Sequence, residues 1–153
     1  MIEREAGLVV LLTQRSAAMR LHASQVAFPG GGMEARDRSI LDTALRETYE
    51  EVGIAPEQIS VLGFLDAMPT VTGYAVTPVV GSVSPSAAII VDPTEVEFAF
   101  EVPLDFLLDK ANVFASEREV HGRKLPIIEY RYREHRIWGA TANILMKLRE
   151  ILR

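Results

Sequence analysis

The decisive stretch of the chain reads Gly31-Gly32-Met33-Glu34-Ala35-Arg36-Asp37-Arg38 and continues, from residue 44, as Ala44-Leu45-Arg46-Glu47-Thr48-Tyr49-Glu50-Glu51-Val52-Gly53-Ile54. The glycines predict a turn, and the pattern from Ser39 to Val52 predicts a helix that ends at Gly53. Within this helix, Glu47, Glu50 and Glu51 are spaced at i, i+3 and i+4, which places their carboxylates on one face. Carboxylates that crowd together repel one another and do not stabilise a hydrophobic core, so the three glutamates predict a functional site.

A divalent cation would explain this cluster. Hard cations such as Mg2+ take oxygen ligands, usually a few carboxylates together with water and the phosphate oxygens of a substrate. The alternative is an acidic helix face that is only solvated. The glycine turn, Arg46 and Gly53 at these spacings favour the metal site. The stretch therefore predicts a metal-dependent site that acts on a phosphate compound.

The composition is that of one globular domain, which we expect to span residues 1–153. The chain has 48% hydrophobic and 24% charged residues and no cysteine, which excludes disulfides and thiolate metal sites. Its apolar run from Gly7 to Leu12 is too short for a membrane span and lacks the flanks of a signal peptide, so we expect a cytoplasmic protein without a membrane partner. A net charge of −5 argues against a nucleic-acid partner.

Hydrophobic patterns outline the other elements and predict a mixed sheet between helices. Strands are expected at 7–13, 26–28, 61–66, 74–81, 96–102 and 136–138, with a hairpin over 117–132 that turns near His121-Gly122. Helices are expected at 39–52, 104–108 and 141–152, with Thr141 as an N-cap. The inward-facing residues of the two long helices are expected to be Ile40, Leu41, Ala44, Leu45, Thr48 and Val52, and Ile144, Leu145, Leu148, Ile151 and Leu152.

The decisive stretch resembles the Nudix box, Gly-x5-Glu-x7-Arg-Glu-U-x-Glu-Glu-x-Gly-U, in which U is a bulky apolar residue. Residues 46–54 follow its second half, with a threonine in one apolar slot. The first half departs from the pattern. A count from Gly32 puts Arg38 in the first Glu slot, whereas a count from Gly31 puts Asp37 there with one extra residue before the second half. We prefer the second count because Asp37 keeps an acid in that slot.

The segment before the box is similar to the signature of the coenzyme A pyrophosphatase branch of the Nudix hydrolases, Leu-Leu-Thr-x-Arg-Ser, a further Arg, then Gly and Phe-Pro-Gly-Gly. Residues 11–31 follow this signature, with Ser24 where the pattern has Gly. Residues 71–78, 95–104 and 138–142 also look like this branch, so the resemblance covers nearly the whole chain. Family members usually carry another apolar strand before the position of Gly7, and we expect either a truncated start or a sheet that lacks or replaces this strand.

The resemblance implies the Nudix fold, an α/β/α sandwich with a mixed β-sheet. It also implies Mg2+- or Mn2+-dependent hydrolysis of the diphosphate linkage of coenzyme A or its derivatives, which gives 3′,5′-ADP and 4′-phosphopantetheine. One alternative is a Nudix hydrolase of another compound, such as ADP-ribose, NADH, a dinucleoside polyphosphate or a nucleoside triphosphate. Another is a non-catalytic ligand-binding protein, which the intact Glu47, Glu50 and Glu51 argue against.

The expected site residues fall into three groups. Glu50 and Glu51 are the first choices for metal ligands, with Glu47 as a ligand or general base and with Gly31 and Glu95 as further candidates. The expected catalytic residues are Glu47, Glu51 and Arg46, and Arg46 is expected to orient a glutamate through an ion pair. Contacts with the substrate are expected from Arg15, Arg20, His22, Gln25, Gly30 and Gly31, although the Arg and His side chains could equally be surface groups. An exposed sheet edge predicts a homodimer.

Overall fold

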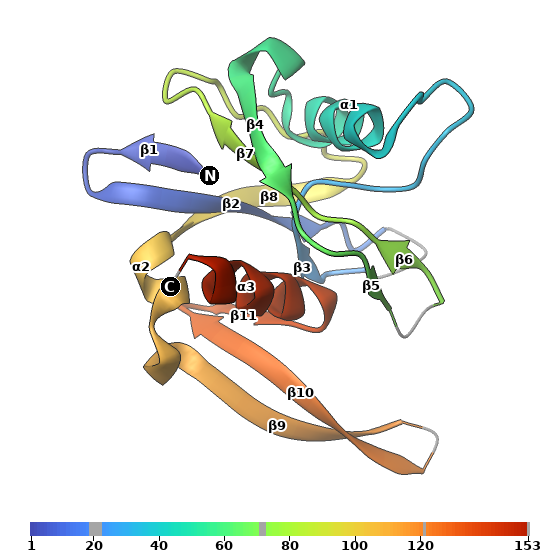
Figure 1. Ribbon diagram of the computed structural model, residues 1–153, viewed down its shortest axis with the longest axis vertical. Helices are drawn as coiled ribbons and strands as arrows, with labels where there is room; N and C mark the ends of the chain where they lie inside the picture. Colours follow the sequence, from blue (N-terminus) through green and yellow to red (C-terminus); the bar gives the residue numbers. More distant parts are fainter. Residues whose placement is uncertain (19–22, 71–72, 121, 153) are drawn as a thin grey trace.

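The computed structural model describes residues 1–18, 23–70, 73–120 and 122–152 (Figure 1). Helix α1 lies over one face of a six-stranded mixed sheet, and α3 lies on the opposite side, beside a three-stranded antiparallel sheet. This arrangement confirms the predicted sandwich. The helices are α1 (Ile40–Val52), α2 (Leu104–Leu108) and α3 (Ala140–Ile151), with short 3-10 turns at Pro56–Gln58 and Lys110–Asn112.

The six-stranded sheet has the order β3-β2-β1-β7-β4, and β8 pairs with β2. Only β1 and β7 pair in parallel within the described part of this sheet. Its strands are β1 (Ile2–Arg4), β2 (Gly7–Arg15), β3 (Val26–Ala27), β4 (Ile59–Phe64), β7 (Val79–Val83) and β8 (Val96–Pro103). The three-stranded sheet contains β9 (Val113–Val120), β10 (Arg123–Tyr132) and β11 (His135–Trp138), and a small hairpin contains β5 (Met68–Pro69) and β6 (Ala75–Val76).

The predicted strand at residues 74–81 is wrong in one respect, because it consists of two strands, β6 and β7. Pro78 lies between them and has no N–H with which to continue a ladder. Its carbonyl oxygen instead accepts a hydrogen bond from the N–H of Leu65, at 2.9 Å. The other predicted strands are confirmed, with ends that shift by a few residues, and residues 2–4 and 68–69 add the short strands β1 and β5. The predicted hairpin turn includes His121, which lies outside the described residues.

Strand β2 carries the core on both of its faces. Val10 and Leu12 belong to a cluster that includes residues of α3, β10 and β11, whereas Leu11 belongs to a second cluster with Val52 at the end of α1. Because successive side chains of a strand point to opposite faces, the apolar run of β2 holds α1 on one side and α3 on the other. Among the described residues, no helix is long and apolar enough to cross a membrane.

Helix α1 has the predicted ends. The Ser39 hydroxyl accepts a hydrogen bond from the N–H of Asp42, and Gly53 closes the helix with a φ of 72°. The predicted inner face is only partly correct. Val52 is fully buried, but Ile40 is 48% exposed, because the sheet covers the C-terminal end of the helix and not its first turn.

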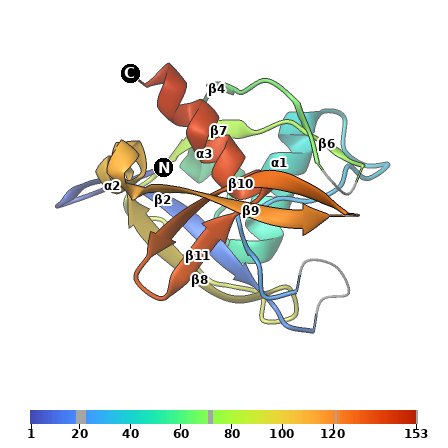
Figure 2. The same ribbon diagram turned by 90° about the horizontal axis from the view of Figure 1, so that it is seen from below.

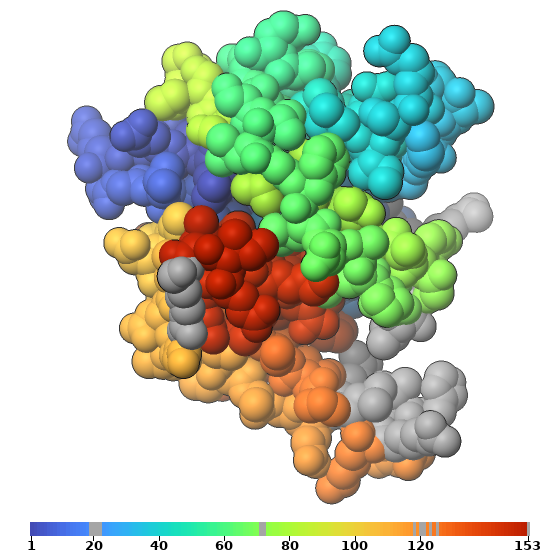
Figure 3. All heavy atoms as spheres, viewed as in Figure 1, coloured from blue at the N-terminus to red at the C-terminus, as the bar shows by residue number. Residues whose placement is uncertain are grey.

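Helix α3 also differs from the prediction at both ends. Its N-cap is Gly139, and the hydroxyl of Thr141 donates instead to the carbonyl oxygen of Val26, at 3.0 Å. This bond ties the start of α3 to β3. Leu145 and Leu148 are buried as predicted, but Ile151 is 64% exposed and Leu152 is also exposed. In Figure 3 the red surface of α3 reaches the front of the molecule beside the green surface of β4.

Candidate active site

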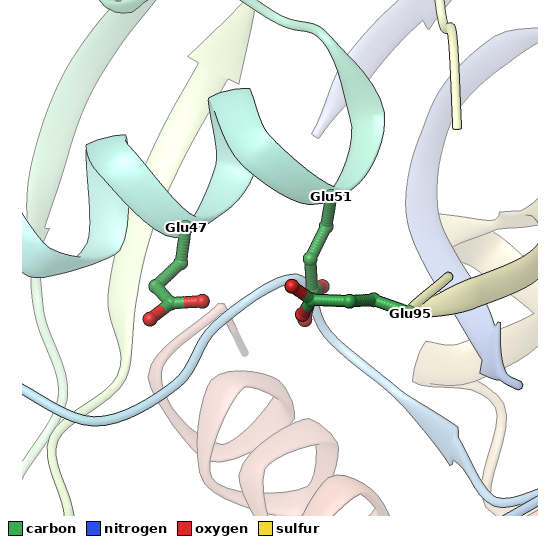
Figure 4. Close-up of side chains that lie close together, drawn as sticks. All are labelled: Glu47, Glu51 and Glu95. Atoms are coloured by element: carbon green, nitrogen blue, oxygen red, sulfur yellow. The ribbon is translucent and has the colours of Figure 1, made fainter. Parts of the chain in front are cut away.

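Three carboxylates meet beside the C-terminal half of α1. Glu47 and Glu51 project from successive turns of this helix, and Glu95 comes from the segment just before β8 (Figure 4). Each offers an oxygen atom within 4.8 Å of the others. Three like charges at this separation repel one another unless a cation lies among them or one of them is protonated.

Glu51 is the buried member of this acidic cluster, and its side chain is 2% exposed. Its Oε2 atom is buried and has no hydrogen-bond partner within the described ranges 1–18, 23–70, 73–120 and 122–152. Burial raises the pKa of Glu51 from its ordinary 4.5 to about 7; the charge of Arg15 and the backbone N–H of Gly30 oppose this rise, and the charges of Glu47 and Glu95 add to it. A buried carboxylate oxygen with no partner, next to two other carboxylates, fits a divalent cation.

The position of Glu95 depends on a turn that packs against the end of α1. The N–H of Ile90 donates to Val52, and the N–H of Asp92 donates to Glu51, at 2.9 and 3.0 Å. The N–H of Glu95 then donates to the carbonyl of Asp92, and its own carbonyl accepts from the N–H of Ser16, at 2.8 Å. The backbone of Glu95 is thus fixed between α1 and the end of β2.

Arg46 orients the cluster from the other side. Its Nη1 donates to Glu47 Oε1 at 2.8 Å and to Glu50 Oε2 at 2.9 Å. Its Nε and Nη2 donate to the two carboxylate oxygens of Asp37, at 2.9 and 2.8 Å, and Nη2 also donates to the carbonyl of Gly32. The expected pairing of Arg46 with a glutamate is therefore present, and it extends to the loop before the helix.

Asp37 holds Arg46 in place. It is nearly buried, and it also accepts hydrogen bonds from the hydroxyl of Thr43 and the backbone N–H of Glu34. These donors, with Arg46 first among them, hold the pKa of Asp37 well below its usual range. The role of Thr43 was not predicted, because a threonine in a helix carries no signal of its own.

Glu50 does not join the other three carboxylates. Its oxygens pair with Arg36 at 2.7 Å and with Arg46 at 2.9 Å, and its side chain is half-exposed. The helical spacing of Glu47, Glu50 and Glu51 places them near one face, but the two arginines hold Glu50 at the rim of the cluster.

Gly31 approaches the cluster closely. A Cβ at this position would lie 2.5 Å from Glu47 Oε1, whereas a Cβ on Gly32 would meet nothing within 4 Å. We therefore expect Gly31→Ala to lower kcat/KM about tenfold or more, because the Glu47 carboxylate must move, and to leave the Tm nearly unchanged, because that carboxylate ends a flexible side chain. Gly32→Ala is the matched control, and equal rates for the two variants would contradict this prediction.

The candidate substrate contacts are placed in part. Arg15 lies with its Nη1 3.7 Å from Glu51 Oε1, and its Nε is buried and has no hydrogen-bond partner in the described part of the chain. Gln25 lies across from Arg15, since its carbonyl accepts the N–H of Arg15 at 2.9 Å. Gly30 donates its N–H toward Glu51. Arg20 and His22 lie outside the described residues.

Ser24 explains one departure from the family signature. Its φ is 57°, in the left-handed region where glycine is favoured, and the signature has Gly at this place. The N–H of Ser24 donates to the carbonyl of Arg15, at 3.2 Å. The chain therefore keeps the glycine-type turn that returns it to β3, although it carries a serine there.

Comparison with known proteins gives the family. The sequence model of the NUDIX domain matches residues 1–140. The chain belongs to the Nudix family. An uncharacterized Nudix hydrolase, NudL, of Photorhabdus laumondii is 43% identical over 139 residues, which cover 91% of this chain and 74% of the relative. This Nudix protein is therefore a hydrolase of phosphorus-containing acid anhydrides, of the kind that acts on nucleoside diphosphate derivatives.

Solved structures agree on the fold. The NUDIX domain of Shewanella oneidensis NrtR, complexed with ADP ribose, superposes with a TM-score of 0.61 at 18% identity and covers 99% of this chain and 82% of that chain. A C. elegans Ap4A hydrolase superposes with a TM-score of 0.53 at 18% identity and covers 62% of this chain and 68% of that chain. At this identity the two likenesses support the Nudix fold alone.

Proposed function

We propose that this Nudix hydrolase cleaves the diphosphate linkage of coenzyme A or its derivatives and releases 3′,5′-ADP and 4′-(acyl)phosphopantetheine. The observation that carries the hydrolysis is the acidic cluster of Glu47, Glu51 and Glu95, with its unpartnered buried oxygen. Residues 11–31, which follow the signature of the coenzyme A branch, support the choice of substrate. The left-handed Ser24 adds to that support, because it preserves the turn that the signature glycine would make.

Mg2+ or Mn2+ would be held by Glu47, Glu51 and Glu95, with Gly31 close by and Glu50 at the rim. Such a cation neutralises diphosphate oxygens and makes a coordinated water more acidic. Glu47 serves as a ligand or as the general base, and its bond to Arg46 fixes the direction in which it accepts a proton. Arg15 holds its Nη1 3.7 Å from Glu51 Oε1, and the partly exposed guanidinium can donate to an anionic oxygen of the substrate there.

A product assay tests the proposal. The purified chain is incubated with coenzyme A and Mg2+, and the products are identified by mass, with ADP-ribose and a nucleoside triphosphate run in parallel. We expect 3′,5′-ADP and 4′-phosphopantetheine from coenzyme A, and no products after addition of a chelator. Cleavage of ADP-ribose but not of coenzyme A would keep the hydrolase and discard the substrate. Metal binding without cleavage of any of these compounds would favour a ligand-binding protein.

The second candidate substrate class is ADP-ribose and other nucleoside diphosphate derivatives. The observation that favours it is the ADP ribose in the complex of the Shewanella oneidensis NUDIX domain, whose fold this chain shares. The cytoplasmic location and the homodimer that the sequence suggests stay predictions.

A further inference from the structure

Two arginines stand side by side on the outer face of the three-stranded sheet, which Figure 2 shows from below. Arg131 of β10 and Arg136 of β11 are direct partners across the antiparallel pair. Tyr130 and Ile137, next to them in sequence, point into the core, so the two arginines project from the opposite face. Like charges in directly opposite positions destabilise a sheet, and such a pair needs an explanation.

A buried carboxylate holds the two arginines together. Glu129 accepts a hydrogen bond on Oε1 from Arg131 Nε at 2.8 Å and one on Oε2 from Arg136 Nε at 2.6 Å. The Nη2 atoms of Arg131 and Arg136 form ion pairs with the same two oxygens, the first of them at 2.6 Å. The Glu129 side chain is fully buried, whereas the side chains of Arg131 and Arg136 are 65% and 56% exposed. One negative charge thus fixes two positive charges at the surface and leaves a net positive charge.

Each guanidinium also lies over an aromatic ring. The Cζ of Arg131 is 5.2 Å from the centre of the Phe114 ring, and the Cζ of Arg136 is 5.6 Å from the centre of the Trp138 ring. These contacts and the bonds to Glu129 restrict both side chains before any ligand arrives, which lowers the entropy cost of binding. We call Phe114, Glu129, Arg131, Arg136 and Trp138 the arginine platform.

The donors of the platform are only partly used. Arg131 and Arg136 each spend Nε and Nη2 on Glu129, and neither Nη1 has a further partner among the described side chains. Two guanidinium groups on exposed side chains match the oxygens of a phosphate, and the Phe114 ring, which is 43% exposed, offers a surface on which a planar base can stack. We propose that the arginine platform is a second binding site, separate from the acidic cluster, for the phosphate group of a nucleotide.

The arginine platform is connected to the acidic cluster through the start of α3, β3 and the segment that follows β3. Trp138 ends β11 immediately before α3, and Thr141 of α3 bonds to Val26 of β3. From β3 the chain runs directly to Gly30, whose N–H faces Glu51. The nucleotide phosphate could therefore belong to the substrate itself, as coenzyme A has a 3′-phosphate, or to a separate nucleotide. Binding of a nucleotide phosphate at the arginine platform does not require the proposed function. Only the case in which the phosphate belongs to coenzyme A rests on that function.

Trp138 is the only tryptophan in the chain, so its fluorescence reports on the platform. The probe is adenosine 5′-monophosphate, titrated into the full chain in the presence of a chelator, with adenosine and inorganic phosphate titrated separately. We expect adenosine 5′-monophosphate to change the fluorescence and to bind more tightly than either fragment. Arg131→Met and Arg136→Met should each weaken its binding about tenfold or more, because each removes a charged hydrogen-bond donor.

Arg133→Met is the matched control. Arg133 lies two residues from Arg131, is exposed, and stacks on the ring of Tyr132, with its Cζ 5.2 Å from the ring centre. Within the described part of the chain, Glu129 pairs with Arg131 and Arg136 and not with Arg133. Its substitution removes the same charge and should leave the affinity unchanged. Arg131→Met keeps Glu129 paired with Arg136, and a thermal melt checks that it folds. Equal affinities of the wild type and Arg131→Met, or no binding of the probe by the wild type, would overturn the proposal.

Turnover of two substrates distinguishes the sources. If the platform binds the substrate's own phosphate, Arg131→Met should lower kcat/KM for coenzyme A about tenfold and leave that for dephospho-coenzyme A, which lacks the 3′-phosphate, unchanged. If it binds a separate nucleotide, both values should stay unchanged while the affinity for adenosine 5′-monophosphate still falls. An enzyme that cleaves neither compound would refute the proposed function and leave the fluorescence test of the platform intact.

Discussion

Glu51→Gln is expected to lower kcat about a thousandfold or more for any diphosphate that the chain cleaves, since a catalytic metal ion supplies several kcal/mol of transition-state stabilisation. Glu51 is the buried centre of the acidic cluster, and its Oε2 has no hydrogen-bond partner among the residues that the structure describes. Gln has the same shape but carries no charge and presents an amide NH2 group to the cation. Steady-state rates with coenzyme A and Mg2+ measure the effect.

Stability separates this loss from misfolding. The pKa of Glu51 is raised to about 7, so the folded metal-free chain binds this proton more tightly than the unfolded chain does. The metal-free wild type should therefore lose stability as the pH rises from about 4.5 to above 7, whereas Glu51→Gln should lose less. Mg2+ should raise the Tm of the wild type and leave that of the variant unchanged. A variant with full activity, or one stabilised by Mg2+ as much as the wild type, would refute a ligand role for Glu51.

Local pattern accounts for the parts of the site that lie on one element. The spacing of Glu47 and Glu51, the helix start at Ser39 and the Gly53 end were all predicted from the sequence, because each depends on residues within one or two helical turns. The exposure of Ile40 and Ile151 was not readable. An apolar stripe tells which side of a helix is inward, but not how far the partner surface extends.

Contacts between distant segments account for what the sequence left open. Glu95 was a loose candidate because its place depends on Asp92 bonding to the end of α1, more than thirty residues earlier. Glu50 was expected with the other glutamates, and its pairing with Arg36 depends on how the loop before α1 folds back. The arginine platform had no sequence signal at all, since Glu129, Arg131 and Arg136 converge only when β10 pairs with β11.

Arg46→Lys tests whether charge alone or geometry orients the cluster. The guanidinium of Arg46 reaches Asp37, Glu47 and Glu50 at once through the donors of one planar fork, and an ammonium cannot match all of these directions. We expect both Arg46→Lys and Arg46→Met to lower kcat/KM about a hundredfold, the upper end of the losses seen when residues that support metal ligands are replaced.

The matched control for Arg46 is Arg38→Met, because Arg38 is 91% exposed and pairs only with Asp42, at 3.4 Å, among the described side chains. Arg38→Met also removes one positive charge, from the residue just before the Ser39 cap of α1. It should change kcat/KM less than twofold, as expected for an exposed ion pair. If charge were the whole contribution of Arg46, Arg46→Lys would retain nearly full activity and Arg46→Met would lose it. High salt would then also lower the activity of the wild type, because it screens charges. If geometry decides, Lys fails as Met does, and salt has little effect, because Arg46 is largely screened from solvent by Asp37, Glu47 and the Gly32 carbonyl.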